Sequence, residues 1–463
     1  MAAVTMKILF VTYSHNILGG IEVWLDTLAT HLTAKGWQAT IALARGSRFN
    51  DPERFRRQWP GHRYVEIDGR TGTNEGRMLA VTRVIERLEP NVVVAVSLAH
   101  ALAATGRLKL NRFPVKLVMP IHATSWQAFE EALSFSSVLD RCIGVNPLHA
   151  EWLARSGFPK SQLGTVINGA RTFQVARRQE RAASEPIRLL FVGRIHDESK
   201  RVFDLPAIAT ELRARGIPFR LTVAGDGPDA DQLRQRLNAE FLGWVEQAEL
   251  QLDVLPRHDI ILITSPLLGE AGPPLVALEA LAAGTVPVIS DFIGVRAPGS
   301  IRDRETALLF ECGNTTQAAR RIEELYSDPA LWQRLSDAGR ETAREFSLDH
   351  SLECWNEQLT EVAEQPPLMP MEGTFPLAKV EPSGRLDRGG LPPTVTDFLR
   401  RTLRRYPSFP NGWEEWPGTI APPTQPTTEQ LAQLKLLDHQ IAESRQNSSV
   451  LARSILRPEG NSD

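Results

Sequence analysis

Two cationic side chains, Arg194 and Lys200, share a loop that follows an apolar run and precedes a helical stretch. In alternating β/α chains, such loops lie at the strand ends where ligands bind. A guanidinium and an ammonium placed together can hold a diphosphate, the first as a planar fork and the second as a point charge. A lone Arg or Lys in such a loop is usually a solvated charge. A second phosphate-binding feature is therefore needed to favour a phosphate site.

That second feature is a helix start at Pro274. The apolar run 260–263 indicates a buried strand, and a helix of strong helix formers then begins at the proline and stops at Gly284. A proline fits the first helical position because its missing N–H would have no partner there. The amides of Leu275 and Val276 are then left at a positive helix end, which suits a phosphate.

Glu279 lies on the face of this helix that the apolar pattern places inside the protein. A buried carboxylate needs a hydrogen-bonding partner. One such partner is a pair of hydroxyls from a nucleotide whose diphosphate rests on the helix start. The alternative is an ordinary strand-helix unit in which Glu279 bonds to protein. The stretch alone does not decide between the two.

His122 follows the apolar run 115–121, where that strand is expected to enter a cleft. A histidine there can bond a sugar hydroxyl or exchange a proton, and a structural histidine is an equal alternative.

The turn 224–228 does not complete a GxGxxG fingerprint, which weakens the case for a nicotinamide or flavin site. Asp229 and Asp231 are interpreted as acids at a helix start rather than as metal ligands. The sequence contains no HExxH, GxSxG or GxxxxGK[ST] pattern.

Composition narrows the class of protein. A chain of 463 residues is too long for one compact core, and its net charge of -3 gives no global case for a nucleic-acid partner. Three distant cysteines favour reduced thiols in a cytoplasmic protein. No apolar run approaches the roughly 20 residues of a membrane span, and the start MAAVTMKILFVTYSHN is interpreted as the first strand rather than a signal peptide.

The chain alternates short apolar runs with helical stretches, which predicts an α/β fold of two doubly wound parallel sheets. In the first half we expect strands at 8–11, 37–43, 92–96, 115–121, 142–145 and 164–167, with the first helix at about 21–35. In the second half we expect strands at 187–192, 219–224, 240–242 and 260–263, and helices at about 203–215, 230–238, 315–327 and 329–346. Two such domains present their strand ends to one another across a cleft.

The predicted organisation is a first domain over 1–170, a linker over 171–185, a second domain over 186–346 and a helix over 347–364 that returns to the first domain. The extension 365–463 is rich in Pro and Gly at first. A helix at 394–406 carries Arg400, Arg401, Arg404 and Arg405, and we favour a solvated basic face over contact with acidic lipid or an acidic partner. A last helix at 428–456 docks on the body or pairs with another chain.

These features together resemble the retaining GT-B glycosyltransferases of family 4. The resemblance covers about residues 6–363 in order and spacing. Each piece alone is unspecific, and the set is specific. The set consists of Gly19-Gly20-Ile21-Glu22, His122, Val192-Gly193-Arg194 with Lys200, Ala224-Gly225-Asp226-Gly227-Pro228, Phe241-Leu242-Gly243-Trp244 and Pro274-Leu275-Val276-Ala277-Leu278-Glu279-Ala280.

The resemblance implies two Rossmann-like domains, with a nucleotide-sugar donor held mainly by the second and an acceptor held by the first. It implies no metal and no cofactor beyond the donor. By position, Arg194 and Lys200 hold the diphosphate, the Leu275 and Val276 amides assist, and Glu279 binds the ribose. Other expected contacts are the donor-binding residues Gly19, Gly20 and Gly272, with Gly20 letting the first loop approach the phosphates, and His122 beside the transferred sugar.

Glu270 departs from the family pattern. It is separated from Glu279 by eight residues, whereas the family usually has seven, so one extra residue lies in the sequence GEAGPP. Glu270 is therefore expected either to reach the sugar through a bulged loop as a catalytic residue, or to leave that contact to the backbone around Ala271 and Gly272.

The sequence thus predicts a metal-independent retaining glycosyltransferase that moves a hexosyl unit from a nucleoside diphosphate sugar to an acceptor hydroxyl. The acceptor is left open among a glycan, a lipid and a small molecule. We expect a cytoplasmic protein, with contact at the inner face of the membrane left open. The alternatives are a nucleotide-sugar epimerase of the same fold and a non-catalytic sugar-nucleotide-binding or scaffold protein.

Overall fold

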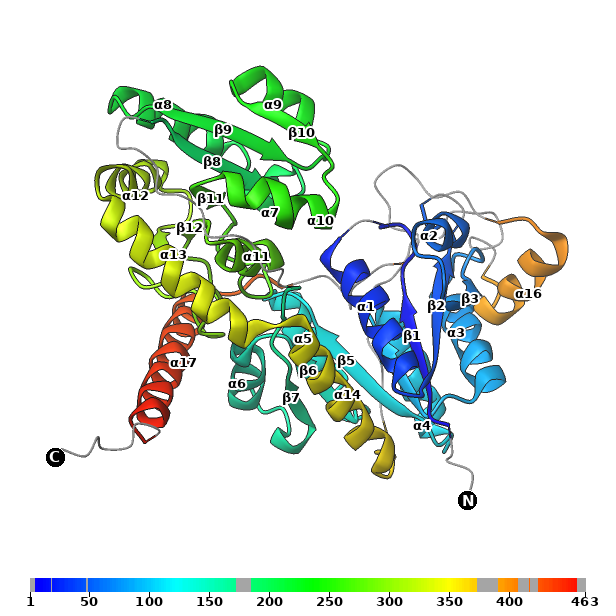
Figure 1. Cartoon of the computed structure of the whole chain (residues 1–463). Coiled ribbons are helices and arrows are strands. Elements are labelled where there is room, and N and C mark those ends of the chain that lie inside the picture. The colour runs from blue at the N-terminus through cyan, green and yellow to red at the C-terminus, as the bar shows by residue number, and fades with distance from the viewer. Residues whose placement is uncertain are drawn as a thin grey trace.

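A computed structural model shows two parallel sheets, each with its own helices (Figure 1). It describes residues 5–17, 19–46, 49–171, 185–372, 390–406, 416 and 424–455. The first sheet has the strand order β3-β2-β1-β4-β5-β6-β7. Its strands are β1 (Lys7–Thr12), β2 (Gln38–Arg45), β3 (Arg63–Asp68), β4 (Val92–Ala95), β5 (Lys116–Ile121), β6 (Arg141–Gly144) and β7 (Leu163–Thr165).

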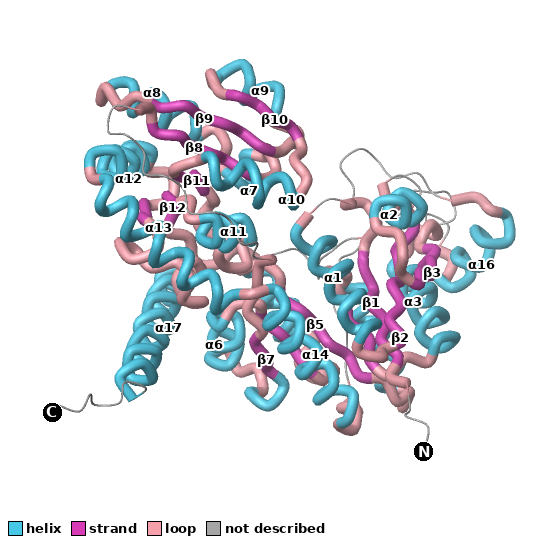
Figure 2. Tube along the Cα trace, viewed as in Figure 1, coloured by secondary structure: helices cyan, strands magenta, loops and turns pink. Residues whose placement is uncertain are grey.

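The second sheet has the order β10-β9-β8-β11-β12-β13, and its strands also pair in parallel. Figure 2 shows the two groups of strands lying apart from one another. The strands are β8 (Ile187–Val192), β9 (Phe219–Ala224), β10 (Glu240–Gly243), β11 (Ile260–Ile263), β12 (Val286–Ser290) and β13 (Leu308–Phe310). The predicted fold class, two doubly wound α/β domains, is confirmed.

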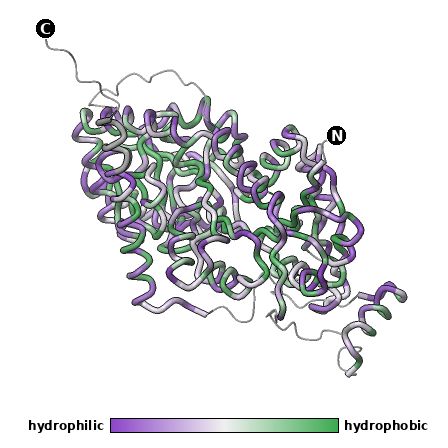
Figure 3. Tube along the Cα trace, turned by 90° about the horizontal axis from the view of Figure 1, so that it is seen from below, coloured by the Kyte–Doolittle hydropathy of each residue, from purple (hydrophilic) through white to green (hydrophobic). Residues whose placement is uncertain are grey.

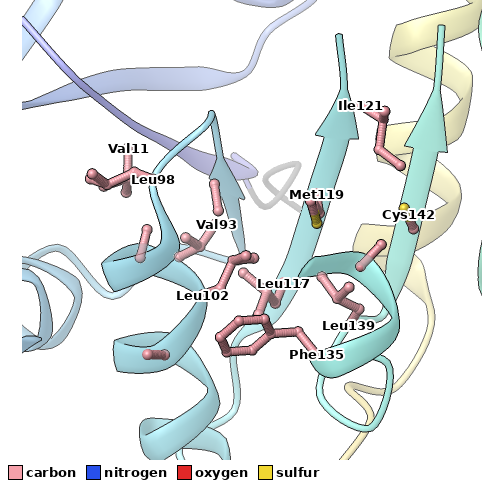
Figure 4. Packing of buried hydrophobic residues seen from close by; sticks show 14 of the residues in the cluster. Val11, Val93, Leu98, Leu102, Leu117, Met119, Ile121, Phe135, Leu139 and Cys142 are labelled. Atoms are coloured by element: carbon pink, nitrogen blue, oxygen red, sulfur yellow. The ribbon is translucent and has the colours of Figure 1, made fainter. Parts of the chain in front are cut away.

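The apolar strands are buried on both faces, as helices on both sides of a sheet require. Alternate residues of β1 enter different cores: Leu9 and Val11 pack in one cluster, and Ile8 and Phe10 in another. Figure 4 shows part of the first cluster, in which side chains of β5 such as Leu117 face the helix α4 (Ala99–Leu110). Near-continuous apolar runs therefore predicted these strands correctly.

The strand order places a topological switch point beside the first strand of each sheet. The chain runs outward from β1 to β3 and then crosses to β4, and it runs from β8 to β10 and then crosses to β11. Loops that leave neighbouring strands at such a point diverge and leave a crevice. The loops after β1, β8 and β11 carry the Gly19-Gly20 pair, the Arg194–Lys200 segment and Glu270 respectively.

Three strands were not predicted: β3, β12 and β13. Strand β3 lies at one edge of the first sheet and mixes polar with apolar residues, so it lacks a long apolar run. Strand β13 is an edge strand of only three residues. Strand β12 carries Pro287, which is unfavourable in a central strand. Tertiary pairing outweighed the weak local signal in all three.

The predicted helices are present. In the first domain the helices are α1 (Gly20–Ala34), α2 (Pro52–Gln58), α3 (Asn74–Leu88), α4, α5 (Trp126–Ser134), α6 (Pro147–Arg155) and the short η1 (Lys160–Gln162). In the second they are α7 (Asp197–Lys200), α8 (Asp204–Ala214), α9 (Ala230–Arg236), α10 (Gln247–Glu249), η2 (Leu250–Val254), η3 (Leu255–Arg257), α11 (Leu275–Ala283), α12 (Thr315–Ser327), α13 (Pro329–Ala343) and η4 (Arg344–Phe346).

Helix α14 (Leu348–Glu364) packs on the first sheet, although it follows the second domain in the chain. Its Trp355 and Leu359 are buried beside α1 and β4. Two backbone hydrogen bonds join Ala170 to this crossing: its amide donates to Phe346 O at 3.0 Å, and its carbonyl accepts from Leu348 N at 2.9 Å. Most of the predicted linker, 172–184, lies outside the described residues.

Helix α17 (Thr428–Ile455) docks on the body (Figure 1). Its Leu434 and Leu437 belong to a core cluster of the first domain, next to α6. From the same helix, Asp438 Oδ1 accepts a hydrogen bond at 2.7 Å from the amide of Ala297, in a loop of the second domain. Helix α17 therefore contacts both domains. Burial raises the pKa of Asp438 to about 6, because water is excluded from the carboxylate.

Helix α16 (Pro393–Leu403) lies against α3 at the outer margin of the first domain (Figure 3). The expectation of a solvated face with four arginines is wrong for two of them. Arg400 is buried and donates to Thr71 O at 2.6 Å, and Arg401 donates to Asp68 O at 3.1 Å.

Among the described residues, no helix combines the length and the apolar character needed to cross a membrane.

Candidate donor and acceptor site

The loop after β8 is shaped by close backbone packing. A Cβ on Gly225 would lie 2.0 Å from Gly193 O, and one on Gly227 would lie 2.3 Å from Ile195 O, so the turn after β9 must carry glycines to pack against this loop. The carboxylate of Asp229 accepts from Asp197 N at 2.7 Å. Asp229 does stand at the start of α9, as predicted, but its carboxylate bonds to this loop instead of capping the helix.

Lys200, at the end of this loop, is half-buried and donates from Nζ to Glu270 Oε1. The same oxygen accepts from Ser265 Oγ at 2.6 Å. In this loop, which carries the extra residue before Glu279, the carboxylate of Glu270 is directed toward Lys200. Glu270 therefore fixes the ammonium group at the cavity edge.

The segment around Glu270 is attached directly to the first domain. Thr124 N donates to Glu270 O at 2.8 Å, and Gly269 N donates to Thr124 O at 3.0 Å. Asn146 Nδ2 donates to Ala271 O at 2.9 Å and to a second carbonyl in the same domain. Thr124 and Asn146 follow β5 and β6, and their part in joining the domains was not predicted. Only their position just after buried strands hinted at it.

Helix α11 begins one residue later than predicted. Pro274 has φ -56° and ψ 149°, so it is the residue before the helix, and Leu275 is the first helical residue. The consequence for the site is unchanged, because the amides of Leu275 and Val276 are still the first in the helix and point away from its carbonyls. Gly284 ends the helix with φ 79°, as its position predicted.

Glu279 is 6% exposed and lies on the buried face of α11. Its Oε1 accepts from Gln251 Nε2 at 2.7 Å and from Gln247 Nε2 at 3.0 Å. Burial raises the pKa of Glu279, and these hydrogen bonds oppose the rise. Glu279 therefore bonds to protein, as one of the two alternatives predicted, and its carboxylate also lines the cavity described below. Binding of a ribose stays a prediction. Neither glutamine was predicted.

The first domain contributes the start of α1. A Cβ on Gly20 would meet no atom within 4 Å, whereas one on Gly19 would lie 2.5 Å from Glu22 Oε2. Burial raises the pKa of Glu22, while Asn16 and the positive charge of Arg194 lower it. Arg194 is exposed and belongs to the second domain, so its charge acts on Glu22 across the domain boundary.

His122 stands at the end of β5 with its ring 4.2 Å from that of Trp24, centre to centre. Its Nε2 has no hydrogen-bond partner among the described residues. Burial lowers the pKa of His122 to about 3, because a charged ring would lose its hydration. His122 is therefore neutral at physiological pH and can exchange one hydrogen bond with a ligand.

The buried histidines predict how stability depends on pH. His149, which is fully buried, also has a pKa lowered to about 3 by burial. In the unfolded chain a histidine binds a proton near pH 6.5. The unfolded state then binds more protons than the folded state between about pH 3 and 6.5, so the free energy of unfolding falls as pH falls through this range.

We expect His149→Asn to reduce this dependence by about 1.4 kcal/mol per pH unit below pH 6. The measurement is denaturant unfolding of parent and variant at several pH values between 4.5 and 7.5. Other titrating groups cancel in the difference between the two proteins. Parallel curves would show that His149 is protonated in the folded chain.

The predicted site residues meet at a cavity of about 320 Å³ between the two domains. Seven of them line it: Gly20, His122, Lys200, Glu270, Gly272, Leu275 and Glu279. Three do not, namely Gly19, Arg194 and Val276. Trp24 and Trp355 also line the cavity and were not predicted. For Trp355 the only signal was its place on a helix expected to return to the first domain.

Two family profiles match the chain, one for each domain. The profile described as glycosyltransferase family 4 matches residues 18–172, and that of the glycosyl transferases group 1 matches residues 186–328. The lipopolysaccharide core biosynthesis glycosyltransferase LpsD of Rhizobium meliloti is 26% identical over 57% of this chain and 73% of its own length. An α-1,4-N-acetyl-D-galactosaminyltransferase of Campylobacter jejuni is named for an undecaprenol-linked substrate. It is 25% identical over 38% of this chain and 48% of its own length.

Solved structures share the fold. Sucrose-phosphate synthase of Thermosynechococcus elongatus superposes with a TM-score of 0.62 and 17% identity, over 77% of this chain and 99% of that one. Anabaena HepE in complex with UDP and glucose gives a TM-score of 0.59 and 17% identity, over 77% of this chain and 100% of HepE. The matched profiles, the related sequences and the paired sheets agree, and the chain belongs to the GT-B glycosyltransferases of the family 4, group 1 type.

Proposed function

We propose that the chain transfers a hexosyl unit from a nucleoside diphosphate sugar to a glycan acceptor with retention of anomeric configuration and without a metal ion. One observation carries the proposal: a single cavity joins Gly20 and His122 of the first domain to Lys200, Glu279 and the start of α11 in the second. Neither the epimerase nor the scaffold alternative is favoured by the comparisons.

In this proposal the second domain binds the donor. The diphosphate rests between the Lys200 ammonium and the amides at the start of α11, and the ribose hydroxyls donate to the Glu279 carboxylate. The diphosphate gains negative charge as its bond to the anomeric carbon breaks. Lys200 and the helix start therefore stabilise the transition state more than the ground state, and this positive potential takes the place of a divalent cation.

Glu270 positions Lys200, because its carboxylate bonds to the ammonium group at the cavity. His122 holds a hydroxyl of the transferred sugar as a neutral partner. Arg194 reaches the phosphates from the rim, where its charge now faces Glu22. The acceptor hydroxyl attacks from the face that the diphosphate leaves, which retains the anomeric configuration, and contact between the domains keeps water from the donor.

The names of relatives support the substrate classes. Solved neighbours are described with UDP and UDP-glucose, and TarM with UDP and saccharide ligands. The sequence relatives are named for lipopolysaccharide core synthesis and for an undecaprenol-linked glycan. A nucleotide-sugar donor and the growing end of a glycan are therefore the substrates that we propose.

The test is a screen of purified protein against UDP-, GDP- and ADP-sugars in EDTA, following thermal stabilisation and released nucleoside diphosphate. One donor should raise the melting temperature and release its diphosphate when a glycan acceptor is added. NMR of the product should then show the donor's anomeric configuration. An inverted product would overturn retention, a requirement for added metal would overturn metal independence, and conversion of donor without acceptor would indicate an epimerase.

A further inference from the structure

Helix α16 has its polarity reversed relative to an ordinary surface helix. Such a helix turns its apolar side chains toward the core and its polar ones toward water. In α16, Asp397 and Arg400 are 2% and 3% exposed, whereas Phe398 and Leu403 are 67% and 59% exposed. Val395, one turn before Phe398, is also exposed. The polar face therefore contacts the protein and the apolar face points outward.

Hydrogen bonds from the polar face join the helix to the first domain. Arg400 donates to Thr71 O at 2.6 Å, and Arg401 pairs with Asp397 at 3.1 Å while it donates to Asp68 O. These partners belong to the end of β3 and the loop that follows it. These polar contacts do not involve Val395, Phe398 or Leu403, which are left available for a different environment.

Exposed cationic groups lie next to the apolar face. Arg404 and Arg405 follow Leu403 directly and are exposed. The nearest carboxylate of the helix, Asp397, is buried and already paired. The outward surface of α16 thus combines apolar side chains with positive charge.

An anionic lipid surface matches both properties. Apolar side chains of an interfacial helix enter the boundary between headgroups and acyl chains, and flanking arginines contact lipid phosphates. We propose that α16 attaches the chain to an anionic bilayer through Val395, Phe398 and Leu403, with Arg404 and Arg405 at the phosphates. Attachment does not depend on the proposed transferase reaction.

A second copy of the chain fits this face less well. A stable protein interface uses roughly 20–30 residues a side, whereas the outward face of an 11-residue helix offers only a few. Helix α16 also stands at the margin of the first domain, far from α17 (Figure 1). Its anchor points follow β3, at the same end of the first sheet as the loops that carry Gly20 and His122. The bilayer would then lie toward the end of the first sheet from which Gly20 and His122 line the cavity.

The experiment is flotation of the full chain with vesicles of phosphatidylcholine alone or mixed with phosphatidylglycerol. The parent should float with the mixed vesicles, and less so as salt is raised. Phe398→Ser together with Leu403→Ser should reduce the bound fraction at least tenfold, because two apolar side chains lose their burial. The control is Leu436→Ser, at a residue of α17 that is 59% exposed, which should float like the parent.

Three outcomes would overturn the inference. They are a parent that floats with neither vesicle, a double variant that floats like the parent, and a parent that is dimeric without vesicles while the double variant is monomeric. Unchanged melting temperatures in the variants establish that they are folded. Donor-induced thermal stabilisation should be the same in the double variant as in the parent, so failure of the membrane inference is separable from failure of the proposed function.

Discussion

Lys200→Ala is expected to lower kcat by about 100- to 1000-fold, the loss typical of removing one group that stabilises developing negative charge. The KM for the donor should rise less, because the contact strengthens as the diphosphate departs. The fold should tolerate the change, since Lys200 is half-buried and Glu270 retains its hydrogen bond from Ser265. Steady-state kinetics with the donor identified in the screen measures both constants.

The matched control is Arg344→Ala, which removes a cation on an exposed ion pair with Glu341. It should leave kcat unchanged. Glu270→Gln adds a test of mechanism: if Glu270 acts by positioning Lys200, this variant should lower kcat, and combining it with Lys200→Ala should add little further loss. Full activity in Lys200→Ala would refute the assignment of the diphosphate site.

Gly20→Val is expected to abolish most turnover while leaving stability intact. A Cβ at this position meets no atom within 4 Å, so the added side chain starts in open space. The added side chain enters the cavity that Gly20 lines, where the donor is proposed to bind. Displacement of reacting groups by about 1 Å costs roughly 100-fold in rate, and we expect a loss of at least that size.

Gly20→Ala should give a smaller loss, which tests whether the effect grows with side-chain volume. Ala34→Val places a larger side chain at the exposed opposite end of α1 and should behave like the parent. The measurements are donor-induced thermal stabilisation and kcat/KM. A Gly20→Val protein with parental donor binding would show that the phosphates and sugar lie elsewhere in the cavity.

Local patterns predicted most of the elements that build the site. The strand β11 and the helix α11 follow from an apolar run, helix formers and a glycine at the helix end, all of which act through neighbouring residues. The same holds for the position of His122 after β5. The three missed strands lie where pairing with neighbours, rather than their own composition, makes the segment extended.

Such local patterns could not predict contacts between segments that are distant in the sequence. Glu270 bonds to Lys200 across 70 residues of chain, and Glu279 accepts from Gln251 across 28. The spacing of the two glutamates showed that the loop was unusual, but the direction of the Glu270 side chain depends on where the loop after β8 lies. The backbone hydrogen bonds between the segment around Glu270 and Thr124 depend likewise on how the two domains meet.

Helix α16 shows most clearly which features the sequence determines and which the tertiary structure decides. The sequence alone determined that residues near 394–406 form a helix with arginines gathered on one side, because side chains repeat every 3.6 residues along it. Only the tertiary structure decided which side faces inward. Carbonyl groups of Asp68 and Thr71 are available to bind arginines there, so the polar side is buried and the apolar side is left exposed.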